Sequence, residues 1–125
     1  MIQANELRIG NRVTIEDREK EVTIIEPYKV GLGNYGIGRA AISASFYNYS
    51  EIQPIRLTEE WLLKTEANHE NGRFHFEHFT IRKNEFTSEW EVFFSDDGNQ
   101  IAIKFLHELQ NLFFAFHKKE LEITQ

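Results

Sequence analysis

The chain contains no cysteine among its 125 residues. This absence excludes disulfide bonds, thiolate zinc sites and cysteine nucleophiles. No apolar run approaches the roughly 20 residues that a membrane-spanning helix needs, and the N-terminus lacks a basic segment followed by an apolar one. We therefore expect a cytoplasmic protein that has no membrane partner.

A surplus of positive charge is also lacking, because 14 basic side chains stand against 20 acidic ones and the net charge is −6. Residues 1–57 hold seven acids and seven bases, whereas residues 58–125 hold thirteen acids and seven bases. An acidic region repels both a phosphate backbone and an anionic membrane surface. Direct nucleic-acid binding is therefore not expected of residues 58–125, although the neutral first part still permits it.

Aromatic side chains are plentiful, with eleven Phe, four Tyr and two Trp. Each ring buries about 150–250 Å² on packing, so these rings suffice for a small core. A chain of this length is one ordinary domain, and neither half would easily bury a core alone. We predict a single domain over residues 1–125, with a β-rich lobe over 1–57 and an acidic α+β lobe over 58–125.

The first lobe shows the alternation of apolar and polar residues that is typical of short antiparallel strands. Pro54 cannot donate to a sheet ladder, so it indicates an edge strand. The expected strands span residues 7–15, 21–25, 28–32, 42–49 and 51–55. Short strands joined by tight turns predict a small SH3-like half-barrel.

The second lobe begins with Thr58, a good N-cap residue, followed by two glutamates at the positive end of a helix. Residues 73–82 predict one strand with a bulge near Glu77 and His78. A second strand over residues 86–94 pairs with it as a hairpin, and residues 96–99 form the next turn. In that second strand, strict alternation points three side chains inward, namely Trp90, Val92 and Phe94. It points three outward, namely Glu89, Glu91 and Phe93.

The last part of the chain predicts a long amphipathic helix. Seven apolar side chains occupy one arc of about 120°: Ala102, Phe105, Leu106, Leu109, Leu112, Phe113 and Phe116. Phe114 falls on the far side of this helix, near His107 and Gln110. The predicted fold class is therefore α+β, with an N-terminal antiparallel half-barrel followed by a helix, a β-hairpin and a long C-terminal helix.

The glycines from Gly31 to Gly36 match the pattern G-x-G-x-x-G. A dinucleotide site also needs a helix directly after the glycines. The residues that follow have no helical apolar arc, so we expect a glycine-rich β-loop and no nucleotide site.

The five histidines do not form a metal-ligand pattern. His75 and His78 point to opposite faces of a regular strand. His107 and His117 lie some 15 Å apart along a helix. No carboxylate pair stands in an apolar setting and no serine has a nucleophile-elbow context. We therefore expect no enzyme, no metal, no cofactor and no small-molecule ligand.

Phe93 and Phe114 are two rings without a place in the predicted core. Phe93 is flanked by Glu89 and Glu91 on its strand. A ring that anchors in a partner's pocket, beside carboxylates that meet basic residues, is typical of a protein interface. The candidate partner-binding residues are therefore Glu89, Glu91, Phe93 and Phe114, and the expected partner has a basic surface.

Three blocks of the sequence are similar to small proteins of Bacteroidetes-type genomes and their prophages. The blocks are residues 5–13, residues 52–64, and residues 107–115 with the Glu120-Leu121 pair. They cover about a quarter of the chain in the expected order. The resemblance implies that the protein is encoded by a mobile element and acts in the cytoplasm of a bacterial host. It assigns no activity to any residue.

Small acidic phage proteins often bind host defence proteins, and an anti-CRISPR protein is one such inhibitor. By this analogy of setting, we expect a non-enzymatic protein that inhibits a host defence nuclease or its guide-RNA complex. The alternative is a small nucleic-acid-binding adaptor that uses the N-terminal β lobe, where Tyr28, Tyr35 and Phe46 accompany Arg39.

Overall fold

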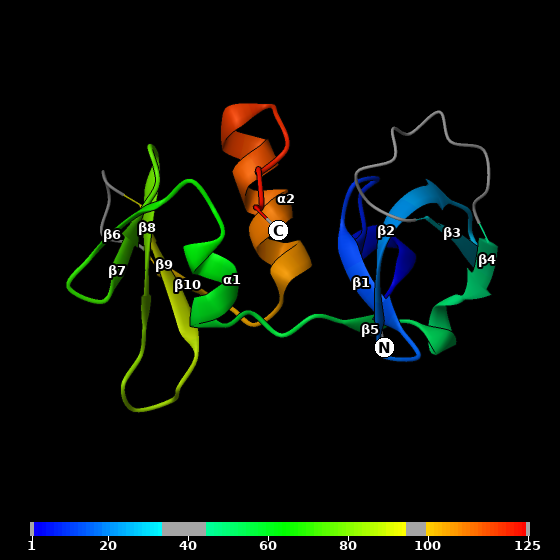
Figure 1. Ribbon diagram of the computed structural model, residues 1–125, viewed down its shortest axis with the longest axis horizontal. Coiled ribbons are helices and arrows are strands. Elements are labelled where there is room, and N and C mark those ends of the chain that lie inside the picture. The colour runs from blue at the N-terminus through cyan, green and yellow to red at the C-terminus, as the bar shows by residue number, and fades with distance from the viewer. Residues whose placement is uncertain (1, 34–44, 95–99, 125) are drawn as a thin grey trace. The chain divides into compact units, whose positions relative to one another are not determined.

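The computed structural model of the chain describes residues 2–33, 45–94 and 100–124 (Figure 1). They form two antiparallel five-stranded sheets and one long helix near the C-terminus, α2 (Leu106–His117). The predicted α+β class is confirmed.

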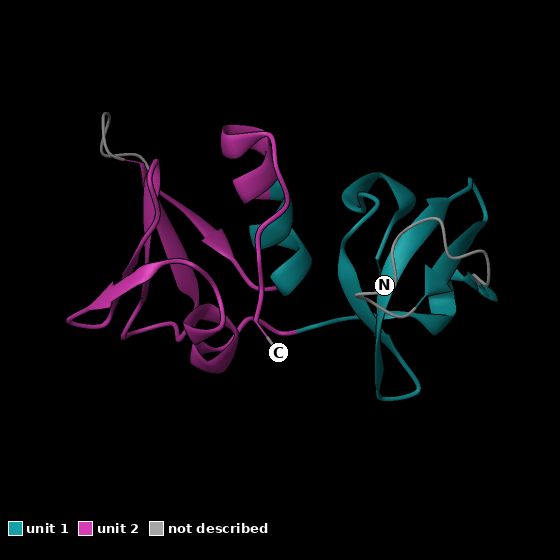
Figure 2. Ribbon diagram, turned by 45° about the horizontal axis from the view of Figure 1, so that its top comes forward, with its two compact units in different colours: residues 1–55, 106–111 teal, residues 56–105, 112–125 magenta. Residues whose placement is uncertain are grey.

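The chain divides into two compact units, each made of two stretches of sequence (Figure 2). Unit 1 comprises Met1–Ile55 and Leu106–Asn111, and unit 2 comprises Arg56–Phe105 and Leu112–Gln125. The first half of α2 therefore belongs to unit 1 and its second half to unit 2. The prediction of a single domain stays a prediction.

Unit 1 contains five strands in the order β4-β3-β2-β1-β5. Its elements are η1 (Ala4–Glu6), β1 (Arg12–Ile15), β2 (Arg18–Ile25), β3 (Lys29–Gly33), β4 (Ser45–Asn48), η2 (Tyr49–Glu51) and β5 (Gln53–Pro54). The edge position of Pro54 is confirmed. Within the described ranges no pairing joins β4 to β5, so this sheet is open and the SH3-like half-barrel stays a prediction.

The core of unit 1 follows from the period of two in its strands. Val13 and Ile15 are buried on β1, and the β-branched Val22 and Val30 are buried beside them on β2 and β3. Gly31 lies in β3, where an added Cβ would stand 3.0 Å from the Cβ of Ile24. The first glycines of the G-x-G-x-x-G pattern thus serve close strand packing, and its last three residues lie outside the described ranges.

Unit 2 contains a sheet whose strands follow one another in the order β10-β9-β8-β7-β6. Its further elements are α1 (Glu59–Leu63), β6 (Asn68–Glu70), β7 (Arg73–His75), β8 (Phe79–Lys83), β9 (Trp90–Phe94) and β10 (Gln100–Ile103). The N-cap is confirmed, because the Thr58 hydroxyl accepts a hydrogen bond from the Trp61 backbone N–H at 3.4 Å. The inward positions of Trp90 and Val92 are confirmed as well, since both are buried. Phe94 is only half-buried.

The prediction of one bulged strand over residues 73–82 is wrong. The chain reverses at Glu77 and His78, and β7 pairs with β8 as an antiparallel hairpin. Phe74 and Ile81 are direct cross-strand partners. They lie on one face because the chain reverses between them. The sequence gives no sign of this reversal, because the loop contains neither glycine nor proline.

The boundaries of two further predicted elements of unit 2 also change. The strand expected over residues 86–94 begins only at Trp90. The predicted helical arc begins too early, because Ala102 lies in β10 and the helix begins at Leu106. The turn expected at residues 96–99 lies outside the described ranges.

The buried surface of α2 is wider than one arc. Leu109 and Phe113 are buried as predicted, but His107 and Gln110 are buried as well. Both polar side chains fall on the side that the sequence assigns to solvent. Phe116, which the predicted arc places in the core, is 41% exposed, so the buried surface is also displaced from that arc.

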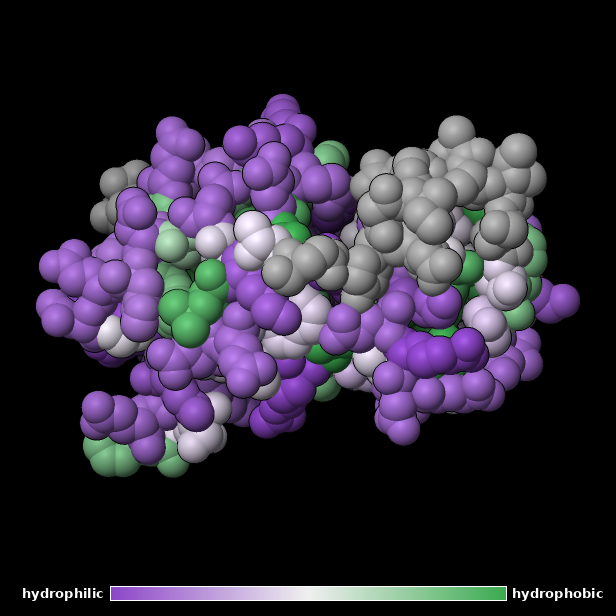
Figure 3. Space-filling model, in the orientation of Figure 1, coloured by the Kyte–Doolittle hydropathy of each residue, from purple (hydrophilic) through white to green (hydrophobic). Residues whose placement is uncertain are grey.

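None of the described helices is both long and apolar enough to cross a membrane. On the face drawn in Figure 3, hydrophilic side chains cover most of the described surface, and hydrophobic ones show in small separate groups.

Candidate functional site

The sheet of unit 2 buries one face and leaves the other open. Alternation along the strands places Phe74, Ile81 and Val92 in the core. The opposite face consists of two cross-strand rows, which we call the open face. The first row is Glu70, Arg73, Arg82, Glu91 and Ala102. The second row is Asn68, His75, Thr80, Phe93 and Gln100.

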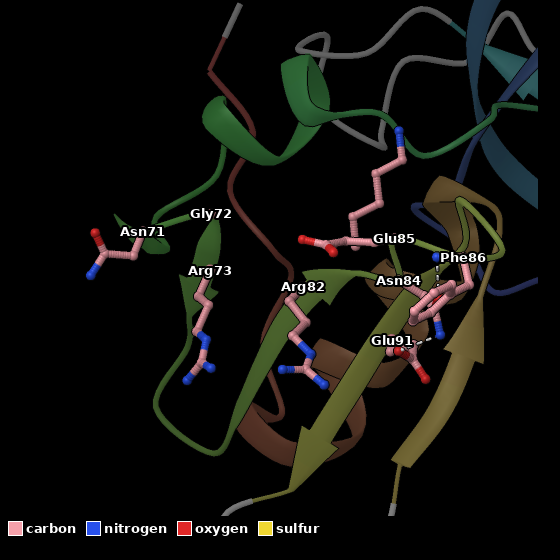
Figure 4. Close-up of a pocket in the computed structure, with 9 residues that line it drawn as sticks. Asn71, Gly72, Arg73, Arg82, Asn84, Glu85, Phe86 and Glu91 are labelled. Atoms are coloured by element: carbon pink, nitrogen blue, oxygen red, sulfur yellow. Dashed lines mark hydrogen bonds between the residues drawn. The ribbon is translucent and has the colours of Figure 1, made fainter.

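Two arginines lie side by side at the centre of the first row. Arg73 and Arg82 are direct cross-strand partners, and both are exposed. Figure 4 shows their side chains extending to the same side of the hairpin. Like charges in this position destabilise a sheet by a few tenths of a kcal/mol, up to about 1 kcal/mol. In the described ranges neither guanidinium has an ion pair within 4 Å, although Glu70 and Glu91 flank the two arginines in the row.

The second row supplies apolar surface and a hydrogen bond. The guanidinium carbon of Arg82 lies 4.4 Å from the centre of the Phe93 ring. An arginine over a ring face is attracted by the ring's negative charge density. His75 Nδ1 lies 3.1 Å from the Thr80 hydroxyl. Phe93 is half-buried, so part of this ring stays accessible beside the arginine.

The loop between β8 and β9 presents a second ring. The Phe86 side chain is 97% exposed. The Asn84 side-chain oxygen accepts hydrogen bonds from the backbone N–H groups of Phe86 at 2.8 Å and Thr87 at 3.1 Å. The Asn84 amide also donates to Glu91 at 3.0 Å. This asparagine turn orders the loop backbone, so binding of the ring requires little further ordering of the main chain.

The loop and the first row enclose a shallow hollow of about 540 Å³. Its lining comprises Asn71, Gly72, Arg73, Arg82, Lys83, Asn84, Glu85, Phe86 and Glu91. The turn at Asn71 and Gly72 has positive φ at both residues, which suits the two-residue connection between β6 and β7. The hollow thus combines basic, acidic and aromatic groups.

Three of the four predicted partner-binding residues lie on or directly before β9. Glu91 and Phe93 occupy the open face, and the Glu89 carboxylate lies 3.8 Å from the Lys104 ammonium. Phe114 lies apart from the sheet, on α2, and is 36% exposed. Whether these four residues bind a partner stays a prediction.

Sequence reasoning missed the three groups that dominate this surface: Arg73, Arg82 and Phe86. The arginines meet only because β7 and β8 form a hairpin. Phe86 was placed in a strand, although it stands two residues after Asn84 and before Thr87 and Ser88. Those polar residues are typical of turns, and they were the available signal.

The open face and the Phe86 loop therefore offer an exposed ring, paired cations and flanking carboxylates on one unit. Such a set recognises another surface by shape and charge. Comparison of the chain with models of protein families, with curated proteins and with solved structures found no match.

Proposed function

We propose that this chain is a non-enzymatic binding protein that holds a partner protein against the open face and Phe86. The carrying observation is the nearly fully exposed Phe86 ring on its ordered loop beside Arg73 and Arg82. Phenylalanine and arginine are among the side chains that are enriched at protein interfaces.

The charge pattern favours a protein over a nucleic acid. An isolated carboxylate of the partner can sit between the two arginines as a bidentate acceptor. Glu70 and Glu91, on either side of the arginines in the same row, repel a continuous phosphate backbone. The same glutamates, with Glu89, attract basic side chains, so the fitting partner carries a carboxylate within a basic surface.

The resemblance to prophage proteins supplies the biological setting of this proposal. Enzymes that handle nucleic acid present basic surfaces to the phosphate backbone. We infer that the partner is a host defence nuclease or its guide-RNA complex in the bacterial cytoplasm. The chain then inhibits by covering such a surface, in the manner of an anti-CRISPR protein.

Affinity capture from a host lysate, followed by titration of the captured protein, tests the proposal. We expect Phe86→Ala to weaken partner binding by about 30-fold, the equivalent of about 2 kcal/mol at an interface hot spot. The double variant Arg73→Gln and Arg82→Gln should weaken it as well. Arg18→Gln in unit 1, whose side chain is 59% exposed, is the matched control and should bind normally. Equal affinity of all variants would refute the proposed surface.

A nuclease assay then tests the inhibitory role. Increasing amounts of the chain are added to a guide-loaded effector and its labelled target. We expect cleavage to fall with the wild-type chain and to persist with Phe86→Ala. Full cleavage at excess wild-type protein would remove this effector as the target.

A second candidate function, nucleic-acid binding by unit 1, is favoured by exposed aromatic rings. Tyr28 is 85% exposed, and Phe46 is exposed opposite Gly31 on the neighbouring strand. Rings on a small half-barrel can stack on unpaired bases. A gel shift with single-stranded RNA at increasing salt separates the two functions: tight, salt-sensitive binding by the isolated chain favours the adaptor.

A further inference from the structure

A cluster of potential metal ligands lies in unit 2, between the β7–β8 loop and the C-terminal end of α2. It consists of Glu77, His78 and His117. One ligand atom from each residue lies within 4.8 Å of the other two. The Nε2 atom of His117 stands 3.9 Å from a Glu77 carboxylate oxygen, and the two imidazole centres are 5.0 Å apart.

The orientation of His117 is fixed by its surroundings. Its side chain is 7% exposed and stacks on Phe113 at 4.0 Å between ring centres. Its Nδ1 lies 3.1 Å from the Phe113 carbonyl oxygen. A carbonyl only accepts, so Nδ1 donates the proton, and in the neutral ring the lone pair resides on Nε2. A histidine that donates one N–H to a carbonyl and offers the other nitrogen is typical of a metal ligand.

Aromatic packing holds the loop that carries the other two ligands. The Phe76 backbone N–H donates to the Phe79 carbonyl at 2.8 Å and closes the loop around Glu77 and His78. The Phe76 ring packs edge-on against Phe113 at 5.9 Å. The Phe79 ring lies 5.8 Å from that of Phe116. The loop backbone is therefore anchored to α2, while the Glu77 and His78 side chains are exposed and can adjust.

The required adjustment is small. Zinc binds imidazole nitrogen and carboxylate oxygen at about 2.0–2.2 Å in a tetrahedral arrangement. Ligand atoms in that arrangement are about 3.3 Å apart. Side-chain rotation that brings atoms from within 4.8 Å to this separation needs no backbone movement. The carbonyl groups at the end of α2 add a partial negative charge that favours a cation.

We propose that Glu77, His78 and His117 bind a zinc ion that ties the β7–β8 loop to the end of α2. Two imidazoles and one carboxylate suit zinc better than calcium or magnesium, which prefer oxygen ligands. The site is separate from the open face and does not depend on the proposed function. The sequence did not reveal the site because His78 and His117 are 39 positions apart. From the sequence, only histidines that are close along the chain were compared, His75 with His78 and His107 with His117.

Calorimetric titration of the purified chain with zinc chloride in a non-chelating buffer at pH 7.5 tests the site. We expect one-site binding with a Kd in the micromolar range or below and a rise in the unfolding temperature that EDTA reverses. Cobalt(II) should give the visible absorption of four-coordinate cobalt. His78→Ala and Glu77→Gln change exposed side chains, so the chain should still fold, and each should weaken zinc binding at least tenfold.

His69→Ala is the matched control, because it removes an exposed histidine of the same sheet outside the cluster. It should leave zinc affinity unchanged. Absence of saturable binding at 100-fold molar excess of zinc, or equal affinity of His78→Ala and wild type, would overturn the proposal.

Discussion

The first half of α2 is held in unit 1 by buried amide side chains, whereas its second half is held in unit 2 by aromatic rings. In unit 1, the Arg12 backbone N–H donates to the Gln110 side-chain oxygen at 2.8 Å, and the Gln110 amide donates to the Gly10 carbonyl at 3.1 Å. The Asn11 amide donates to the Asn111 side-chain oxygen at 2.7 Å, and the Asn111 amide donates to the Glu6 backbone carbonyl at 2.9 Å.

In unit 2, no comparable amide network is present among the described residues of α2. Phe113 is buried against Phe76 and the His117 ring, and Phe116 contacts Phe79 and Phe94. Such contacts depend on buried area and tolerate small shifts. Hydrogen bonds to a loop backbone are directional and accept only one register. Hydrogen bonds therefore orient the unit 1 half of the helix, while buried apolar side chains pack in both halves: Leu106 and Leu109 in the first, Phe113 in the second.

The largest effect that tests this comparison is expected from Phe113→Ala. Removing a fully buried ring should cost about 3–5 kcal/mol of unfolding free energy, measured by urea denaturation. The neighbouring Phe114→Ala is the matched control and should change stability by about 0.5 kcal/mol, since surface changes are small. A loss of several kcal/mol from Phe114→Ala would place that ring in the core and remove it from the candidate binding residues.

A smaller effect is expected from Gln110→Leu, which keeps the size of the side chain and removes both hydrogen bonds. The Arg12 N–H and the Gly10 carbonyl would lose their partner in a buried setting, at about 1–3 kcal/mol for each group. Gln110→Glu would place a carboxylate against the Gly10 carbonyl oxygen in a buried site and should cost at least as much as Gln110→Leu. If Gln110→Leu is as stable as wild type in urea, the amide network does not hold the helix.

The smallest effect concerns pH and again belongs to unit 1. Burial lowers the pKa of His107, and Glu108 and Glu6 only partly oppose this. The unfolded chain therefore takes up the proton at higher pH than the folded one, and stability falls as pH drops below about 6.5. Between pH 7.5 and 5.5 the wild type should lose more unfolding free energy than His107→Gln. Parallel stability curves for the two proteins would contradict this assignment.

On the candidate binding surface, the sequence pattern of one strand places some residues, whereas the pairing of two strands places others. The outward positions of Glu91 and Phe93 follow from alternation along one strand, so the sequence sufficed to place them. Arg73 and Arg82 meet because β7 pairs with β8 in one particular register. A shift by one residue would send these side chains to the opposite face.

The sequence by itself determined the α+β class, the cap at Thr58, the edge strand at Pro54 and the buried position of Leu109. Each of these depends on local geometry: a helical or strand period, a capping hydroxyl or a missing N–H group. Only the tertiary structure decided that His107 and Gln110 are buried and that His78 meets His117. These facts depend on which distant segments pack together, and the period of a single helix does not encode that.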